Sequence, residues 1–295
     1  MNHFSFELAL IAMIPGFFLC GYIFYKDRVE REPISLLAVL FGAGAVAYVP
    51  SHFLEKLLVK AIDSLFANSM QLSVEGIYTY NSIISETLHN VLCAFFGFAL
   101  VPIFIKFAVL YFATHNNKNF NYLFDGVVYS VFVSLGFAMA ENAVFAIQND
   151  VDLIIPKALT SVSCNLFVAI IMGYFYTMWH MRFTANRIES KLLKTEIIKE
   201  DKIRSSTGWL VGCIAASTLF LGLYNLASFG KNQTVTVLFY VIIYTFYGLS
   251  FVIINHVASK DTSAKNYLCK VIAKSHPELS CQQIEDSVLK GADEI

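Results

Sequence analysis

The sequence predicts an all-α, polytopic integral membrane protein with about seven transmembrane helices. Of its 295 residues, 57% are hydrophobic and only 15% are charged, whereas soluble domains use roughly 45–50% apolar residues. The apolar residues form blocks of about 20 or more, the length that a helix needs to cross a hydrocarbon core about 30 Å thick. The formal net charge is −1, and no basic patch with interleaved aromatic residues suggests a nucleic-acid partner.

Seven apolar segments predict the spans, and membrane lipid is therefore the expected surrounding. The predicted spans are Phe6–Tyr25, Ile34–Leu57, His89–Phe112, Leu123–Ile147, Ile155–Trp179, Gly208–Phe229 and Thr234–His256. The far end of the second span is crowded by His52, Glu55 and Lys56. These long polar side chains can extend to the membrane surface, so they are compatible with a span.

Basic residues predict the orientation and the domain organisation. Lys and Arg gather after the first, third, fifth and seventh spans, whereas the loops on the other side hold only Lys60, Lys157 and Lys231. Positively charged loops stay in the cytoplasm, which predicts an outside N-terminus and a cytoplasmic tail in the plasma (inner) membrane. We expect a multi-span membrane domain over residues 1–258 and a short helical tail over residues 259–295.

Two cytoplasmic segments have helical patterns of their own. Residues 182–206 alternate charged residues with Leu and Ile at helical spacing, which predicts an amphipathic helix near the membrane surface. The string Ser275-His276-Pro277-Glu278 predicts the N-terminal cap of a helix in the tail.

Glu141 is the most informative residue, because it lies in the middle of the fourth predicted span. A carboxylate has no water to solvate it in hydrocarbon, so a glutamate at this depth marks a functional site that has a partner. The residues around it form the string GFAMAEN.

Four strings in the chain resemble motifs of the PrsW family of intramembrane proteases, which is similar to the CAAX-prenyl endopeptidases. The loop after the first span looks like the family's D-R-x-x-x-E-P, and the third span carries the lysine of an EExxK motif. The fourth span is similar to DGxxY followed by GFxxxEN. The residues that carry the resemblance are Asp27, Arg28, Glu32, Pro33, Lys106, Asp125, Gly126, Tyr129, Gly136, Phe137, Glu141 and Asn142.

The resemblance implies an activity and a set of catalytic groups. PrsW-like enzymes cleave membrane proteins within or next to their spans. The two glutamates of EExxK, the glutamate of FxxxE, and histidines and an acid on later spans would surround a catalytic water. Such a water is activated by a divalent metal or by a glutamate base with a second group to stabilise the oxyanion.

Most of those positions are substituted here. With Lys106 as the reference, the EE pair falls on Pro102 and Ile103. The fifth-span histidine falls on Asn165, and the HxxxD of the sixth span falls on Leu221 and Asn225. Only Glu141 is retained. The depths of these residues in their spans agree, so we expect them to converge on one buried polar cluster.

The substitutions predict a catalytically inactive homologue that binds or scaffolds a membrane client. Leucine, proline and isoleucine offer no ligand, and asparagine is a poor zinc ligand and no general base. Without a charged partner, Glu141 is expected to be protonated and to bond to Asn165 or Asn225. The alternative is an active endopeptidase with a non-standard site that uses Glu141, and only this alternative needs a divalent metal.

Two further interpretations remain beside these. The polar residues could merely hydrogen-bond helices to one another, at about 1 kcal/mol per contact. A transporter is disfavoured, because the chain shows no internal repeat.

Two histidine–glutamate pairs lie away from the predicted cluster. Glu86 and His89 are three residues apart, as are His52 and Glu55, a spacing that metal sites use. The four residues could build one metal site near the outer surface, although ion pairing at the surface is the simpler explanation. The six cysteines show no CxxC spacing, so we expect them to have no metal or disulfide chemistry.

Overall fold

The structure, a computed structural model, describes residues 3–72, 78–80, 83–149, 151–199, 205–229 and 233–292. The helices are α1 (His3–Lys26), α2 (Ile34–Leu65), α3 (Ile83–Leu92), α4 (Val101–Thr114), α5 (Asp125–Gln148), α6 (Val151–Lys194), α7 (Thr207–Ser228), α8 (Gln233–Ser259), α9 (Ala264–Ser275) and α10 (Cys281–Ala292). The short elements are the 3-10 turn η1 (Ala67–Ser69), the strands β1 (Met70–Leu72) and β2 (Tyr78–Tyr80), and the π-helical segment η2 (Cys93–Leu100), which joins α3 to α4.

The helices confirm the prediction of a polytopic helical membrane protein. Six segments are long and apolar enough to cross a membrane, and the apolar part of α1, Leu10–Lys26, is shorter. Large apolar side chains point outward along them: Val46, Phe112 and Val252 are 71%, 84% and 63% exposed. An apolar surface of this extent fits lipid. The outside position of the N-terminus stays a prediction.

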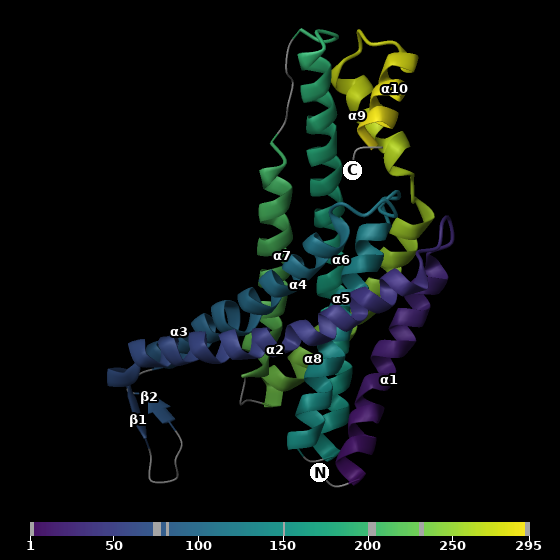
Figure 1. Ribbon diagram of the computed structural model, residues 1–295. Helices are drawn as coiled ribbons and strands as arrows, with labels where there is room; N and C mark the ends of the chain where they lie inside the picture. Colours follow the sequence, from purple (N-terminus) through teal and green to yellow (C-terminus); the bar gives the residue numbers. More distant parts are fainter. Residues whose placement is uncertain are drawn as a thin grey trace.

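Helices α5 and α6 form the centre of the bundle. Helices α1 and α2 pack on α5, and α7 and α8 pack on α6. The first four turns of α5, residues 125–139, are buried throughout. Helix α2 and the continuous α3–η2–α4 segment cross α5 and α6 at a steep angle (Figure 1). This crossing brings side chains of α2, η2 and α4 to the C-terminal half of α5, where Glu141 lies.

Helix α2 and the segment after it differ from the prediction. The helix runs to Leu65 rather than Leu57, because no glycine or proline interrupts residues 57–65. After α2 and the turn η1, strands β1 and β2 form a two-stranded antiparallel hairpin, in which Met70 is opposite Tyr80. Strands of three residues carry too little alternation to be recognised in a sequence.

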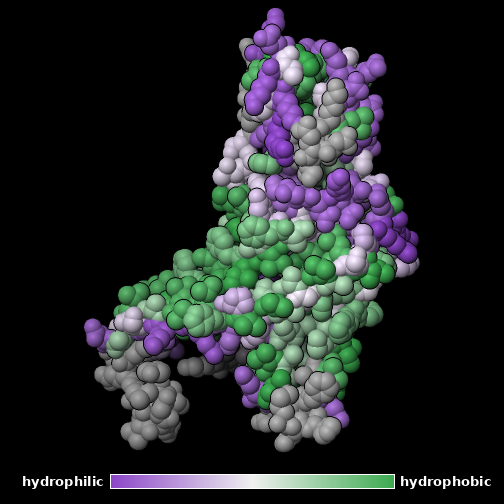
Figure 2. Space-filling view, in the orientation of Figure 1, coloured by the Kyte–Doolittle hydropathy of each residue, from purple (hydrophilic) through white to green (hydrophobic). Residues whose placement is uncertain are grey.

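Helix α6 also differs from the prediction, because the fifth span and the amphipathic segment form one helix. Its 44 residues make it about 66 Å long, and no glycine or proline breaks it between Gly173 and Lys194. Figure 2 shows that its far half lies beyond the apolar band, in the hydrophilic end of the molecule. The predicted surface helix is therefore an extension that leaves the membrane.

The tail helices α9 and α10 pack against this extension of α6 (Figure 1). Helix α10 begins at Cys281, six residues after Ser275, where the expected cap string begins. Ser280 is its cap instead: its hydroxyl accepts from the Gln283 N–H, and the Gln283 side chain accepts from the Ser280 N–H. This reciprocal pair is a capping box. The division of the chain into a membrane domain and a tail stays a prediction.

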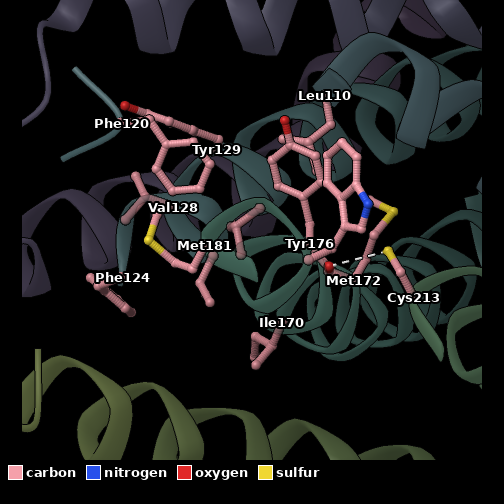
Figure 3. Packing of buried hydrophobic residues seen from close by; sticks show 14 of the residues in the cluster. Leu110, Phe120, Phe124, Val128, Tyr129, Ile170, Met172, Tyr176, Met181 and Cys213 are labelled. Carbon is pink, nitrogen blue, oxygen red and sulfur yellow. Dashed lines mark hydrogen bonds between the residues drawn. The ribbon is translucent and has the colours of Figure 1, made fainter. Parts of the chain in front are cut away.

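An aromatic cluster fills the core between α4, α5 and α6. Tyr176 is fully buried, stacks on Phe120 at 5.9 Å and shares a hydrogen bond of 2.9 Å with Thr114. Phe120 also meets the ring of Tyr129 edge-on. Figure 3 shows Phe120 and Tyr129 on one side of the cluster and Tyr176 toward the other side, near Cys213, whose thiol donates to the Met172 carbonyl. The cluster fixes α5 against α6.

Two glycine contacts let the central helices approach backbone to backbone. A Cβ atom on Gly136 would overlap the Phe41 carbonyl, and one on Gly44 would overlap the Val133 carbonyl, so α2 and α5 touch at both points. These contacts place the Glu141 turn of α5 directly beside α2.

The Gly136→Ala variant is therefore expected to lose stability, because α2 must move to admit the methyl group. Overpacking of this kind costs about 1–3 kcal/mol, measured as a lower thermal midpoint of the detergent-purified protein. Gly42→Ala is the matched control: its Cβ would meet nothing within 4 Å, and alanine favours the helix. Equal midpoints for the two variants would contradict the close contact.

Candidate functional site

A cavity of about 340 Å³ opens beside the C-terminal half of α5. Five helical segments line it, and each contributes side chains spaced three or four residues apart, which places them on one helical face. The polar lining residues are Tyr48, His52 and Glu55 of α2, Lys106 of α4, Glu141 and Gln148 of α5, Lys157, Ser161 and Asn165 of α6, and Tyr224, Asn225 and Ser228 of α7. Polar groups with both signs of charge thus face one another inside an apolar bundle.

Glu141 forms an ion pair in this cavity. Its Oε1 lies 2.8 Å from the Lys157 Nζ, and its Oε2 accepts from the Ser161 hydroxyl at 3.4 Å. The two charged side chains are 27% and 30% exposed. The expectation that Glu141 lacks a charged partner and bonds to Asn165 or Asn225 is therefore wrong. Both carboxylate oxygens are already acceptors.

Lys106 is a second ammonium group on the same cavity, and it is 1% exposed. Its Nζ donates to Asn165 Oδ1 at 2.6 Å and to the Ser134 hydroxyl at 3.5 Å, and it lies 4.6 Å above the Phe137 ring. The Asn165 amide donates in turn to the Ser161 carbonyl. Lys106 and Asn165 thus satisfy each other and join α4 to α6.

The other positions that the sequence comparison with the motifs singled out, Pro102, Ile103, Leu221 and Asn225, differ in where they lie. Pro102 and Leu221 line the cavity. Ile103 does not, because one residue further along a helix points about 100° away, and it is fully buried in a neighbouring apolar cluster. Asn225 donates to the Phe98 carbonyl of the π-helical segment at 2.7 Å, so its amide joins α7 to η2.

The two predicted histidine–glutamate pairs are separated, so they do not build one site. His52 and Glu55 line the cavity, with the Glu55 Oε1 accepting from Ser51 at 2.7 Å and the Oε2 lying 3.9 Å from His52. His89 instead lies 2.7 Å from Asp63. The combined site of His52, Glu55, Glu86 and His89 is therefore wrong.

Of the other motif residues, Asp125 and Tyr129 lie at the opposite end of α5, outside the cavity lining. Asp125 accepts from the N–H groups of Asn121 and Tyr122 and is close to Glu32, whose pKa is raised to about 7 by burial. Tyr129 is also beside Glu32. These residues connect the loop before α2 to the start of α5. Asn142 faces away from the cavity and is buried.

The cavity residues that sequence reasoning missed are Lys157 and Ser161, whereas Glu55 was assigned to a site near the outer surface. Lys157 was counted among the outer loop charges. Its spacing of four residues from Ser161 and of eight from Asn165 places all three on one face of α6, and this periodicity is the signal that could have found it.

Comparison with known proteins agrees with the motifs. The model of the PrsW family of intramembrane metalloproteases matches residues 32–251. The chain belongs to this family. The matched segment begins just before α2 and ends in α8, and it contains every residue that lines the cavity.

Curated relatives carry the name Protease PrsW. The protein of Geobacillus kaustophilus is 32% identical over 171 residues, which are 58% of this chain and 66% of the relative. That of Oceanobacillus iheyensis is 32% identical over 161 residues, 55% of this chain and 64% of the relative. That of Bacillus subtilis is 24% identical over 210 residues, which are 71% of this chain and 85% of the relative. The chain thus aligns with slightly less than two thirds of the first two relatives. No solved structure matches.

The PrsW family description implies a metal, but the donor set of this cavity does not fit one. Among the described residues, no three His, Cys, Asp or Glu donor atoms of the cavity lie within 4.8 Å of one another. The carboxylate of Glu141 faces an ammonium group at 2.8 Å, and a second ammonium group, that of Lys106, lines the same cavity. A divalent cation would meet two ammonium groups and two carboxylates, those of Glu141 and Glu55, that already accept hydrogen bonds from Lys157 and Ser51.

Proposed function

We propose that this PrsW-family protein binds a membrane client in its central cavity without cleaving it. The ion pair between Glu141 and Lys157 carries the proposal. In this pair, a lysine ammonium group occupies the place beside the retained glutamate where a hydrolase needs a metal or an attacking water.

The other wall residues support the proposal. Pro102 and Leu221 stand where the family resemblance implies catalytic groups, and they can neither bind a metal nor move a proton. Asn165 and Asn225 are each used in hydrogen bonds between helices. The cavity opens among helices that reach the lipid, so a transmembrane segment is the client that it fits, and membrane lipid is its surrounding.

One observation favours a second candidate, an endopeptidase with a non-standard site. Glu55 lines the same cavity as Glu141, and His52 is beside it. Two carboxylates with two ammonium groups could hold a water, take its proton and stabilise an oxyanion without a metal. In this second function, Glu55 or Glu141 is the base and Lys106 or Lys157 stabilises the oxyanion.

The test is peptidase activity of the detergent-purified full-length chain on single-span membrane-protein substrates, with Glu141→Gln and Glu55→Gln measured beside it. We expect no cleavage by any of the three. Client binding is read by photo-crosslinking from a probe placed at Ser228, on the cavity wall, with a probe at the lipid-facing Val252 of α8 as the control.

Two results would overturn the proposal. Cleavage by the unchanged chain that is lost in Glu141→Gln or Glu55→Gln establishes the second function. Equal crosslinking of membrane proteins from Ser228 and from Val252 shows that the cavity has no client.

A further inference from the structure

A cluster of metal-binding side chains lies outside the cavity, where α2, α3 and the hairpin meet. It comprises Asp63 near the end of α2, His89 in the last turns of α3, and Cys93 at the first residue of the π-helical segment. Within the described residues it is the one group of three His, Cys, Asp or Glu donors whose atoms all lie within 4.8 Å of one another. We propose that Asp63, His89 and Cys93 bind a divalent transition metal of the zinc type.

The distances suit such an ion. His89 Nε2 lies 2.7 Å from Asp63 Oδ1 and 3.5 Å from Cys93 Sγ. Zinc bonds of about 2.0–2.3 Å place neighbouring ligands of a tetrahedral ion roughly 3.3–3.7 Å apart. The Cys93–His89 separation already matches. Asp63 has to swing outward by about half an ångström, and its side chain is 48% exposed.

The donor types agree with the geometry. A thiolate, an imidazole and a carboxylate are the three ligand types that zinc takes in proteins, and the combination is unsuited to calcium or magnesium, which prefer oxygen. His89 and Cys93 are four residues apart, so one helical face presents both. On binding, the Cys93 thiol releases its proton to solvent. Three protein ligands leave the fourth position to water.

The surroundings would hold the histidine in the orientation that coordination needs. Tyr80 of the hairpin lies 2.9 Å from His89 Nδ1, so the Nδ1–H can donate to the tyrosine oxygen while Nε2 faces the metal. A histidine ligand usually has its second nitrogen fixed by such a partner. The rings of Phe66 and Tyr80 cover the imidazole at 5.3 and 5.5 Å. Cys93 is 3% exposed, and the half-exposed Asp63 provides the path of entry.

The π-helical segment is a second, independent observation. It begins at Cys93 and runs to Leu100. Such segments are rare, and they occur frequently at functional sites. Here the change of helical pitch starts at the proposed ligand itself. The bound ion would join α2 to α3 and, through Tyr80, fix the hairpin.

Cobalt titration of the chelator-treated full-length protein in detergent tests the proposal. We expect one equivalent of Co²⁺ to bind with the charge-transfer absorption of a cobalt–thiolate bond and with zinc displacing it. His89→Gln and Cys93→Ser should each weaken binding at least about tenfold, and zinc should raise the thermal midpoint of the unchanged chain but not of these variants. Cys20→Ser, a buried thiol in α1, is the matched control and should bind normally.

The cavity variant Glu141→Gln separates this site from the cavity. Metal binding that persists in Glu141→Gln and is lost in Cys93→Ser supports the proposal and leaves the proposed client-binding function untouched. Absence of the thiolate absorption in the unchanged chain overturns the metal site, whether or not the variants fold. Binding lost in Glu141→Gln but kept in Cys93→Ser places the metal in the cavity and overturns both proposals.

Discussion

The Lys157→Met variant is expected to be markedly less stable than the unchanged protein. Loss of the Lys157 ammonium group leaves the Glu141 carboxylate without a counter-charge inside the membrane domain, where an unpaired charge is costly. Breaking a fully buried pair costs about 3–5 kcal/mol. Both side chains here are partly exposed to the cavity, so about 2–3 kcal/mol is expected. The measurement is the thermal midpoint of the detergent-purified protein.

A double-mutant cycle isolates the pair. Glu141→Gln alone should also destabilise, because it leaves the ammonium group unpaired, whereas Lys157→Met combined with Glu141→Gln should recover much of the loss. Lys60→Met is the matched control, because this exposed lysine of α2 also lies toward the predicted outer side. Each of the two variants therefore removes one positive charge from that side of the membrane. Additive effects of the two cavity variants would show that the charges do not interact.

The sequence predicted the location of the cavity better than the interactions among the side chains that line it. The depths of Glu141, Asn165, Leu221 and Asn225 in their spans were sufficient to expect them together, and all four line the same cavity. Depth along a helix follows from counting residues. The partner of each side chain depends on the rotation of two helices about their axes, and the sequence of one chain does not fix that rotation.

Lys157 illustrates this limit. A lysine near the end of a span normally extends to the membrane surface, and this rule assigned it to the outer side. The glycine contacts between α2 and α5, and the packing of α5 on α6, turn Lys157 toward Glu141 instead. Ile103 illustrates the converse, since it neighbours Pro102 in sequence yet belongs to the adjacent apolar core.

The contacts among Asp63, His89 and Cys93 were also beyond sequence reasoning. His89 was paired with Glu86 from their spacing, whereas its close partners are Asp63, which is 26 residues away in the chain, and Cys93. Asp63 reaches His89 because α2 extends eight residues beyond its predicted end. An error in one helix boundary therefore concealed a contact between two helices.

The Glu32→Gln variant is expected to change the pH dependence of stability. Burial raises the pKa of Glu32 from 4.5 to about 7, and this residue lies in the loop before α2. The folded protein therefore holds the proton more tightly than the unfolded chain does. Stability is fully present below about pH 4.5 and falls as the pH rises through about 7. The thermal midpoint should decline over this window, and the decline should flatten in Glu32→Gln.

The groups around Glu32 determine the direction in which its pKa is shifted. Asp27, Asp125 and Tyr129 face Glu32 and add no positive charge, and the pKa of Asp27 is likewise raised by burial. An ionised Glu32 would therefore add a second negative charge to a buried acidic group of residues. Glu30→Gln in the same loop is the comparison variant. Glu30 is exposed, and its charge is one of the smaller causes of the raised pKa of Glu32, so its removal should flatten the pH slope less than Glu32→Gln does. A midpoint that rises between about pH 5 and about pH 7, or equal slopes for the two variants, would contradict a buried protonated Glu32. A flattening that is larger in Glu32→Gln than in Glu30→Gln would instead show that this loop is docked onto the start of α5, the helix that carries Glu141.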